Sequence, residues 1–100
     1  MLELRFTAEV YPWSANASWR FVTVPADQSD AIAEIVRPFR GRGFGSVRVE
    51  ATIGATVWRT SVFPDRGSGC YVLPLKQAVR KAEGLLDGDP ATVTLRLVDL

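Results

Sequence analysis

The sequence has no histidine, one cysteine and no long apolar run, and each shortage excludes a class of protein. Without histidine, neither a Ser-His-Asp triad nor a Cys/His zinc site can form. The single cysteine, Cys70, cannot form an intramolecular disulfide, which fits a reducing compartment. No apolar stretch approaches the roughly 18 residues that a membrane-spanning helix needs, and no secretory signal follows Met1. These absences predict a cytoplasmic protein that uses no metal or cofactor and makes no membrane contact.

Charge is balanced along the chain. Twelve basic and eleven acidic residues give a net charge of +1, and neither half carries the excess that attracts nucleic acid or anionic lipid. Apolar residues make up 47% and charged residues 23% of the 100 positions, which is the composition of a globular domain with one core. We therefore expect residues 1–100 to form a single domain and a monomer.

Alternation of apolar and polar residues with a period of two predicts a mainly β protein. In residues 3–11, for example, Leu4, Phe6 and Val10 alternate with charged and hydroxyl side chains. Further strands are expected at 18–24, 47–52, 55–63, 70–73 and 91–97. Prolines end several of these strands. Apolar stripes predict helices near 28–37 and 75–86. Residues 12–18 are expected to form a loop or a wide turn.

The two halves of the sequence repeat one order of elements. Residues Phe6 to Pro12 align with Trp58 to Pro64, since both segments read aromatic, three mixed residues, valine, aromatic, proline. The order strand, strand, helix, strand then occurs twice, over about 1–51 and 52–100. One such unit would leave open strand edges and a bare apolar face. We expect two units to form a pseudo-twofold β-barrel of about six strands with two capping helices; chance similarity between β segments is the alternative.

Leu73 to Val93 contain a strand, a proline, a helix with an arginine, Gly-Leu, Gly-Asp and a valine-rich strand. This stretch resembles AbrB-type swapped-hairpin domains, many of which bind DNA. Four longer motifs cover nearly the whole chain: Trp-x-Phe-Val-x-Val-Pro at 19–25, Gly-Ser-Val-x-Val at 45–49, Thr-Ile-Gly to Trp-x-Thr-Ser and Pro at 52–64, and Gly-x-Tyr-x-Leu-Pro-Leu-Lys to Gly-Asp at 69–89. In this order they resemble the uncharacterised family DUF1905, from which Pro90 is a departure. The resemblance implies a double-split β-barrel on one chain and no particular activity.

Aromatic residues are dense in the strands and loops, at Trp13, Trp19, Phe21, Trp58, Phe63 and Tyr71. They form either core and rim packing or the lining of a pocket for a flat or apolar ligand. Arg20 directly follows Trp19, and Arg59 directly follows Trp58. Since neighbours on a strand point to opposite faces, tryptophans that point inward would leave these arginines in solvent, where they could not share a pocket with the tryptophans.

Basic residues gather in two places. Arg37, Arg40, Arg42 and Arg48 surround a glycine-rich segment with no acidic residue between them, and the glycines would let backbone N–H groups approach an anion. The segment lacks the Gly-Lys-Ser/Thr ending of a P-loop. Lys76 and Arg80 share a face of the second helix, with Asp87 and Asp89 as candidate partners. A solvated loop and a solvated helix face are the simpler explanations.

We expect a non-catalytic binding module, because no general base or carboxylate pair is placed for catalysis. The candidate ligand-binding residues, for a small molecule or a protein partner, are Trp19, Trp58, Tyr71, Arg40, Arg42 and Phe44. The disfavoured alternative is nucleic-acid binding, through Arg37, Arg40, Arg42 and Arg48. Balanced charge argues against that alternative, and so does the placement of both half-barrels on one chain. A structural or regulatory domain without a ligand is the third hypothesis.

Overall fold

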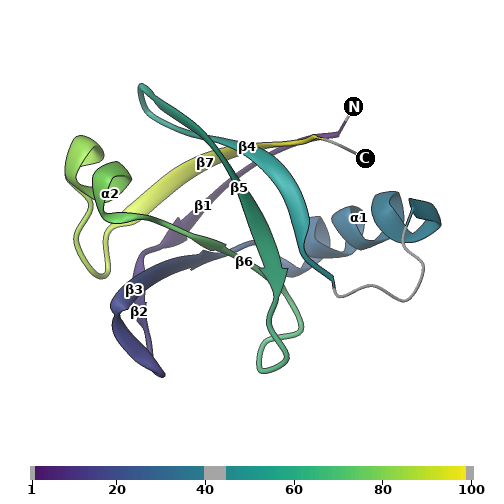
Figure 1. The fold of residues 1–100 in the computed structure, drawn as a ribbon, viewed down its shortest axis with the longest axis horizontal. Coiled ribbons are helices and arrows are strands. Elements are labelled where there is room, and N and C mark those ends of the chain that lie inside the picture. The colour runs from purple at the N-terminus through teal and green to yellow at the C-terminus, as the bar shows by residue number, and fades with distance from the viewer. Residues whose placement is uncertain (1, 40–44, 99–100) are drawn as a thin grey trace.

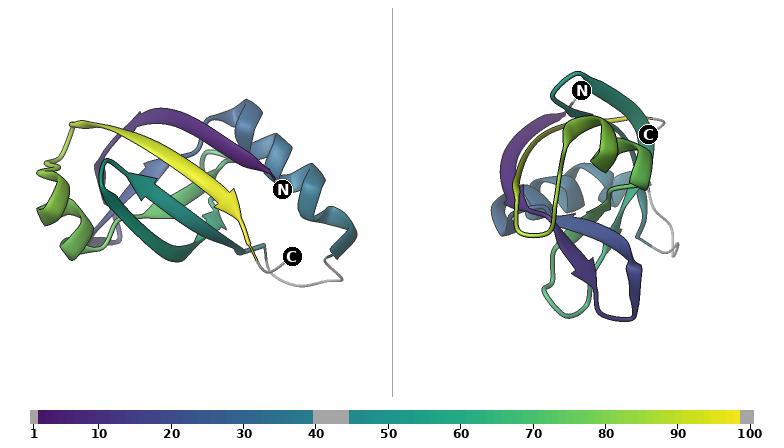
Figure 2. Two further views of the ribbon diagram at one scale, coloured as in Figure 1. Left: turned by 90° about the horizontal axis from the view of Figure 1, so that it is seen from above. Right: turned by 90° about the vertical axis from the view of Figure 1, so that its left-hand side faces the viewer.

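The computed structural model describes residues 2–39 and 45–98. It confirms the prediction of a mainly β protein: one curved antiparallel sheet carries two α-helices at opposite ends of the molecule (Figures 1 and 2). The strands are β1 (Glu3–Glu9), β2 (Tyr11–Trp13), β3 (Asn16–Thr23), β4 (Val47–Ile53), β5 (Thr56–Pro64), β6 (Tyr71–Pro74) and β7 (Pro90–Leu97). The helices are α1 (Ala26–Val36), a short 3₁₀ helix η1 (Arg37–Phe39) and α2 (Gln77–Glu83). None of the described helices has the length and apolarity needed to cross a bilayer.

Strand pairing is long in one half of the sheet and short in the other. The order is β1-β7-β4-β5-β6-β3-β2. β1 pairs with β7 over seven positions, and β4 pairs with β5 over seven. In contrast, β3 pairs with β6 over three positions and β5 with β6 over two. Backbone hydrogen bonds therefore hold the first half of the sheet, made of β1, β7, β4 and β5, more continuously than the second half, made of β6, β3 and β2.

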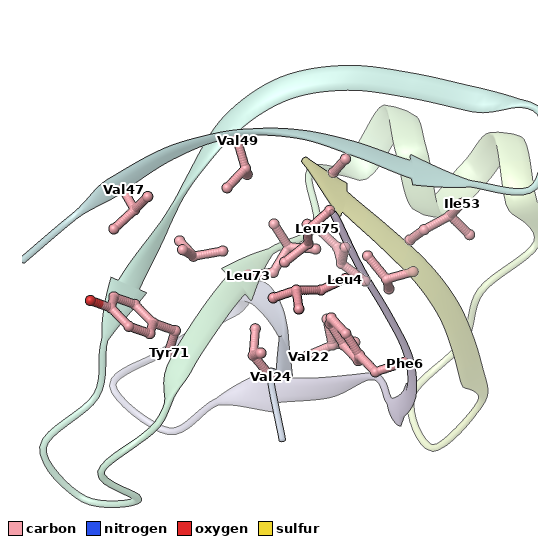
Figure 3. Packing of buried hydrophobic residues seen from close by; sticks show 14 of the residues in the cluster. Leu4, Phe6, Val22, Val24, Val47, Val49, Ile53, Tyr71, Leu73 and Leu75 are labelled. Atoms are coloured by element: carbon pink, nitrogen blue, oxygen red, sulfur yellow. The ribbon is translucent and has the colours of Figure 1, made fainter. Parts of the chain in front are cut away.

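The core fills the inside of the curved sheet (Figure 3). Val49 of β4 and Val93 and Leu95 of β7 are fully buried, whereas Arg48 and Arg96 on the same strands are exposed. This alternation is the burial that the period-two pattern predicts. Both helices add apolar side chains to the buried set: Ile32, Val36 and Val79.

The loop or wide turn expected at residues 12–18 is shorter than predicted. Only residues 14–15 form a turn, and the strands on either side of it make a hairpin that raises the strand count from about six to seven. β2 ends at Trp13, which pairs with Asn16 at the start of β3. Just after the turn, the Asn16 Oδ1 atom accepts hydrogen bonds from the backbone N–H (3.1 Å) and the hydroxyl (2.7 Å) of Ser18. Pro12 is tolerated because β2 lies at the edge of the sheet, where a missing N–H costs no ladder bond.

The helices begin and end differently from the expectation. α1 starts directly after Pro25 and not near residue 28, and no side chain caps it. Ser29 instead turns inward: its hydroxyl donates to the Val24 carbonyl (2.9 Å) and accepts from the Tyr71 N–H (3.0 Å), which ties α1 to β6. α2 is shorter than 75–86 and ends at Gly84, whose φ of 64° suits a glycine C-cap.

Strand pairing joins the two halves of the chain in a matched way. The first strand of each half pairs with the last strand of the other, β1 with β7 and β5 with β4, and the β4–β7 and β3–β6 pairs also join the two halves. A duplicated strand-strand-helix-strand unit would give this pattern. The duplication and the pseudo-twofold closure of the barrel stay predictions.

Candidate functional site

The β2–β3 hairpin carries a row of aromatic rings on one face. Trp13 stacks on Trp19 with centroids 5.2 Å apart and planes at 8°, and it meets Phe21 edge-on at 6.0 Å. Because Val22, the next residue after Phe21, is fully buried, Phe21 and Trp19 lie on the face away from the core. Trp13 and Trp19 remain 38% and 52% exposed. Folding therefore leaves a large part of this aromatic face in solvent.

This aromatic face forms one wall of a groove of about 860 Å³. The groove is lined by residues of β2, β3, β5 and β6 and of the segment that leads into α2. Its aromatic lining includes Trp13, Trp19, Phe21, Trp58 and Phe63. Small-molecule sites in proteins are typically clefts of roughly 300–1,000 Å³ with mostly apolar and aromatic walls. The groove has the size and the surface of such a site.

The groove brings both tryptophans together with both arginines that follow them in sequence. Trp19 is exposed and Arg20 half-buried on β3, whereas Trp58 is buried and Arg59 exposed on β5. The condition that the tryptophans point inward fails at Trp19. At the buried Trp58 it holds, and there the expectation is wrong, because Arg59 lines the same groove. Alternation separates neighbours within one strand, but a groove bounded by several strands and a helix reaches side chains from both faces.

Four cationic side chains line the groove: Arg20, Arg59, Lys76 and Arg80. Arg20 has a partner, since its Nε donates to Oδ1 of Asp87 at 2.6 Å. The expected pairing of Asp87 with the cations of α2 is thus wrong, because the chain turns Asp87 toward β3. Asp89 accepts instead from the backbone N–H of Leu86.

The other cations of the groove form no ion pair with a described carboxylate. Within residues 2–39 and 45–98, no carboxylate oxygen lies within 4.0 Å of the cationic nitrogens of Arg59, Lys76 or Arg80. Among the described lining residues there is one carboxylate, Asp65, and it accepts from the N–H (3.0 Å) and hydroxyl (2.8 Å) of Ser68 in its own loop. The groove therefore combines an aromatic wall with a local excess of positive charge in a nearly neutral chain.

The predicted ligand-binding residues have different outcomes. Trp19 and Trp58 line the groove. Tyr71 lies outside it, in the core cluster, with its hydroxyl directed away from most of the labelled core side chains (Figure 3). Arg40, Arg42 and Phe44 fall outside the described residues.

Sequence reasoning missed the cations of the groove. Arg20 and Arg59 were set aside by the alternation argument, and Lys76 and Arg80 were interpreted as a solvated helix face. Their signal was present: two Trp-Arg pairs on strands, and two cations four residues apart on a helix. What the sequence could not give is the pairing that brings β3, β5 and α2 to one groove.

The nucleic-acid candidates lie on separate elements. Arg37 belongs to η1, and its Nη2 lies 2.6 Å from Oε2 of Glu34, which offsets its charge. Arg48 is exposed on β4, and Arg40 and Arg42 fall outside the described residues. Nucleic-acid binding stays a prediction.

The fold and the groove together define a mainly β domain with a single curved sheet and an aromatic, cation-lined surface. The chain belongs to the family described as a domain of unknown function, DUF1905, whose family model matches residues 6–95. This match confirms the resemblance found in the sequence motifs, whereas the AbrB-type resemblance stays a prediction. A search of curated proteins found no match to the chain.

Proposed function

We propose that the protein is a non-catalytic binding module whose ligand is a small molecule held in the groove. The observation that carries this proposal is the aromatic surface left in solvent beside the groove, where Trp13, Trp19 and Phe63 are 38%, 52% and 39% exposed. Burial of aromatic side chains is among the largest gains of folding. Aromatic rings that remain exposed to solvent along a concave surface are therefore suited to contact a ligand.

The shape of the surface favours a small molecule over a protein partner. A specific protein interface buries about 800 Å² on each partner and is broad, whereas the exposed rings of Trp13, Trp19 and Phe63 gather around one groove. Both Trp19 and Trp58 contact this space from different strands. A small planar ligand would bury its rings against both of them.

The chemistry of the lining supports binding without catalysis. The chain has no histidine, and the Asp65 carboxylate on the groove is already bonded to Ser68. The Thr60 hydroxyl lines the groove, but a hydroxyl needs an adjacent base to become a nucleophile. Binding and orientation are the activities that these residues support.

A fragment screen followed by NMR tests the proposal. Fragments that bind in the groove shift the indole N–H signals of both Trp19 and Trp58, with the same dissociation constant at each. Trp19→Ala removes this response, whereas Phe39→Ala, which removes an aromatic ring that is 66% exposed and outside the groove, preserves it. A library in which no fragment moves either indole signal at millimolar concentration would refute the proposal.

We further propose that the two halves of the chain form a double-split, AbrB-like barrel that is a monomer in the cytoplasm. The matched pairing of β1 with β7 and of β5 with β4 supports a duplicated unit, and the single cysteine supports a reducing compartment. Light scattering on the eluting protein tests the oligomeric state, with 11.0 kDa expected for one chain and twice that mass contradicting it.

A further inference from the structure

We infer that the ligand of the groove is a planar ring that carries an anionic group, a carboxylate or a phosphate. The ring packs against the tryptophans, and the anionic group is bound by Arg59, Lys76 and Arg80. This inference rests on the proposed small-molecule site and adds the chemical class of its ligand.

The ring is indicated by the geometry of the aromatic wall. Trp13 and Trp19 already stack in parallel, at 5.2 Å and 8°, and Trp19 keeps 52% of its surface in solvent. Offset stacking of a further ring on such a surface is favourable beyond the area that it buries. Trp58 lines the same groove from β5 and is itself held by the core, so it offers a fixed second contact.

The anionic group is indicated by the distribution of charge. Asp87 neutralises Arg20 at 2.6 Å, and Asp65 is bonded within its own loop. Arg59, Lys76 and Arg80 therefore face the groove without a described carboxylate within 4.0 Å. A bound carboxylate or phosphate would supply the missing counter-charge.

One of these cations, Arg80, is positioned by the backbone. The Arg80 Nε donates to the Leu75 carbonyl at 3.0 Å, which fixes the guanidinium in a half-buried position. The Arg80 backbone N–H bonds to the Lys76 carbonyl at 3.1 Å, so the two cations lie one turn apart. A guanidinium that is held in place loses less entropy when it forms a two-bond contact with a carboxylate or phosphate.

The charge excess is local, which indicates a small ligand. The whole chain carries only +1, too little to attract a polyanion at long range. A ligand with one anionic group uses the short-range cations of the groove and needs no extended basic surface. The same observation disfavours a nucleic acid as the occupant.

Matched pairs of probes test the inference on the full chain by titration calorimetry and by the indole N–H signals. The first pair is indole-3-acetate and its neutral counterpart indole-3-acetamide; the second is adenosine monophosphate and adenosine. We expect the anionic member of at least one pair to bind about tenfold more tightly or better, because charge-assisted hydrogen bonds add to the ring contact. The pair that shows the preference distinguishes a carboxylate from a phosphate.

Charge-removing variants locate the anionic group. The double variant Arg59→Gln with Lys76→Gln should abolish the preference, so that the anionic probe binds no more tightly than the neutral one. The matched control, Arg48→Gln with Lys81→Gln, removes two exposed cations outside the groove and should preserve the preference. The single variants Arg59→Gln and Lys76→Gln repeat the test if the double variant fails to fold.

The outcomes separate this inference from the proposed function. If neutral and anionic probes bind the groove equally well, or if the preference survives in the Arg59→Gln, Lys76→Gln variant, the inference is overturned and the binding module stands. If neither the probes nor any fragment moves the indole signals of Trp19 and Trp58, the proposed function fails as well.

Discussion

The two halves of the sheet use their outer faces differently. On β1 and β7 the outer face is polar: the hydroxyls of Thr7 and Thr92 meet at 2.9 Å, and Arg96 lies between Glu3 at 3.8 Å and Glu50 at 3.6 Å. On the β2–β3 hairpin the outer face is aromatic and partly exposed. The first half is explained by folding alone. The second half carries apolar surface that folding does not require, and the groove extends from this surface to β5 of the first half.

The comparison predicts the largest loss of stability when a buried side chain is truncated on the inner face of the first half of the sheet. Leu95 of β7 is fully buried, so Leu95→Ala should lower the free energy of unfolding by about 3 kcal/mol, through lost burial and the cavity left behind. Urea denaturation measures this change. Leu86→Ala, at a residue that is 72% exposed, is the control and should change stability by less than about 0.5 kcal/mol. Equal effects would contradict the assigned core.

The second half, with its short strand pairings, should depend more on side-chain hydrogen bonds. Ser29→Ala removes the hydroxyl that links the Val24 carbonyl to the Tyr71 N–H. Because both groups are then left unsatisfied in a buried position, we expect a loss of about 2 kcal/mol in chemical denaturation. Ser14→Ala, in the exposed turn of the hairpin, should be close to neutral. A neutral Ser29→Ala would show that this link is dispensable.

Two glycines with positive φ separate the cost of backbone strain from the cost of a steric clash. Gly54 lies in a turn and Gly84 caps α2. Gly54 has a φ of 58° in the β4–β5 turn, and a Cβ there would collide with the Glu83 carboxylate, which accepts from the Thr56 hydroxyl at 2.6 Å. Gly84 has a φ of 64° but open space around it. Gly84→Ala should cost about 1 kcal/mol from strain alone, and Gly54→Ala about 0.5 kcal/mol more, since the flexible Glu83 must move. Thermal unfolding of both variants checks the order.

The smallest effect on stability is expected at the groove itself. Trp19→Ala removes a half-exposed ring and its stack on Trp13, a change worth about 0.5–1 kcal/mol. The same denaturation assay measures it. A loss as large as that of Leu95→Ala would mean that the aromatic face belongs to the core, and the difference between the two halves of the sheet would disappear.

The sequence predicted the parts of this molecule that depend on local periodicity. Alternation in residues 3–11 and 91–97 located β1 and β7, because one buried face imposes a period of two. The hairpin at Tyr11 to Thr23 was missed, because Pro12 and the polar turn resemble a loop until the strand is known to lie at an edge. Trp19 and Trp58 were chosen for their residue type. Their meeting with Arg20 and Arg59 depends on long-range strand pairing, which alternation within single strands does not reveal.

The most direct test of the account asks whether Trp19 and Trp58 belong to one ligand site. Trp19 lies on the exposed face of β3, whereas Trp58 lies on the buried face of β5. Indole-3-acetate is titrated into the protein while the indole N–H signals of both residues are followed, first in the unaltered chain and then in Trp19→Ala. The account predicts that one dissociation constant fits both signals, and that the shift at Trp58 is lost or strongly weakened in the variant. Unmoved signals, or a Trp58 response of the same strength without Trp19, would contradict it.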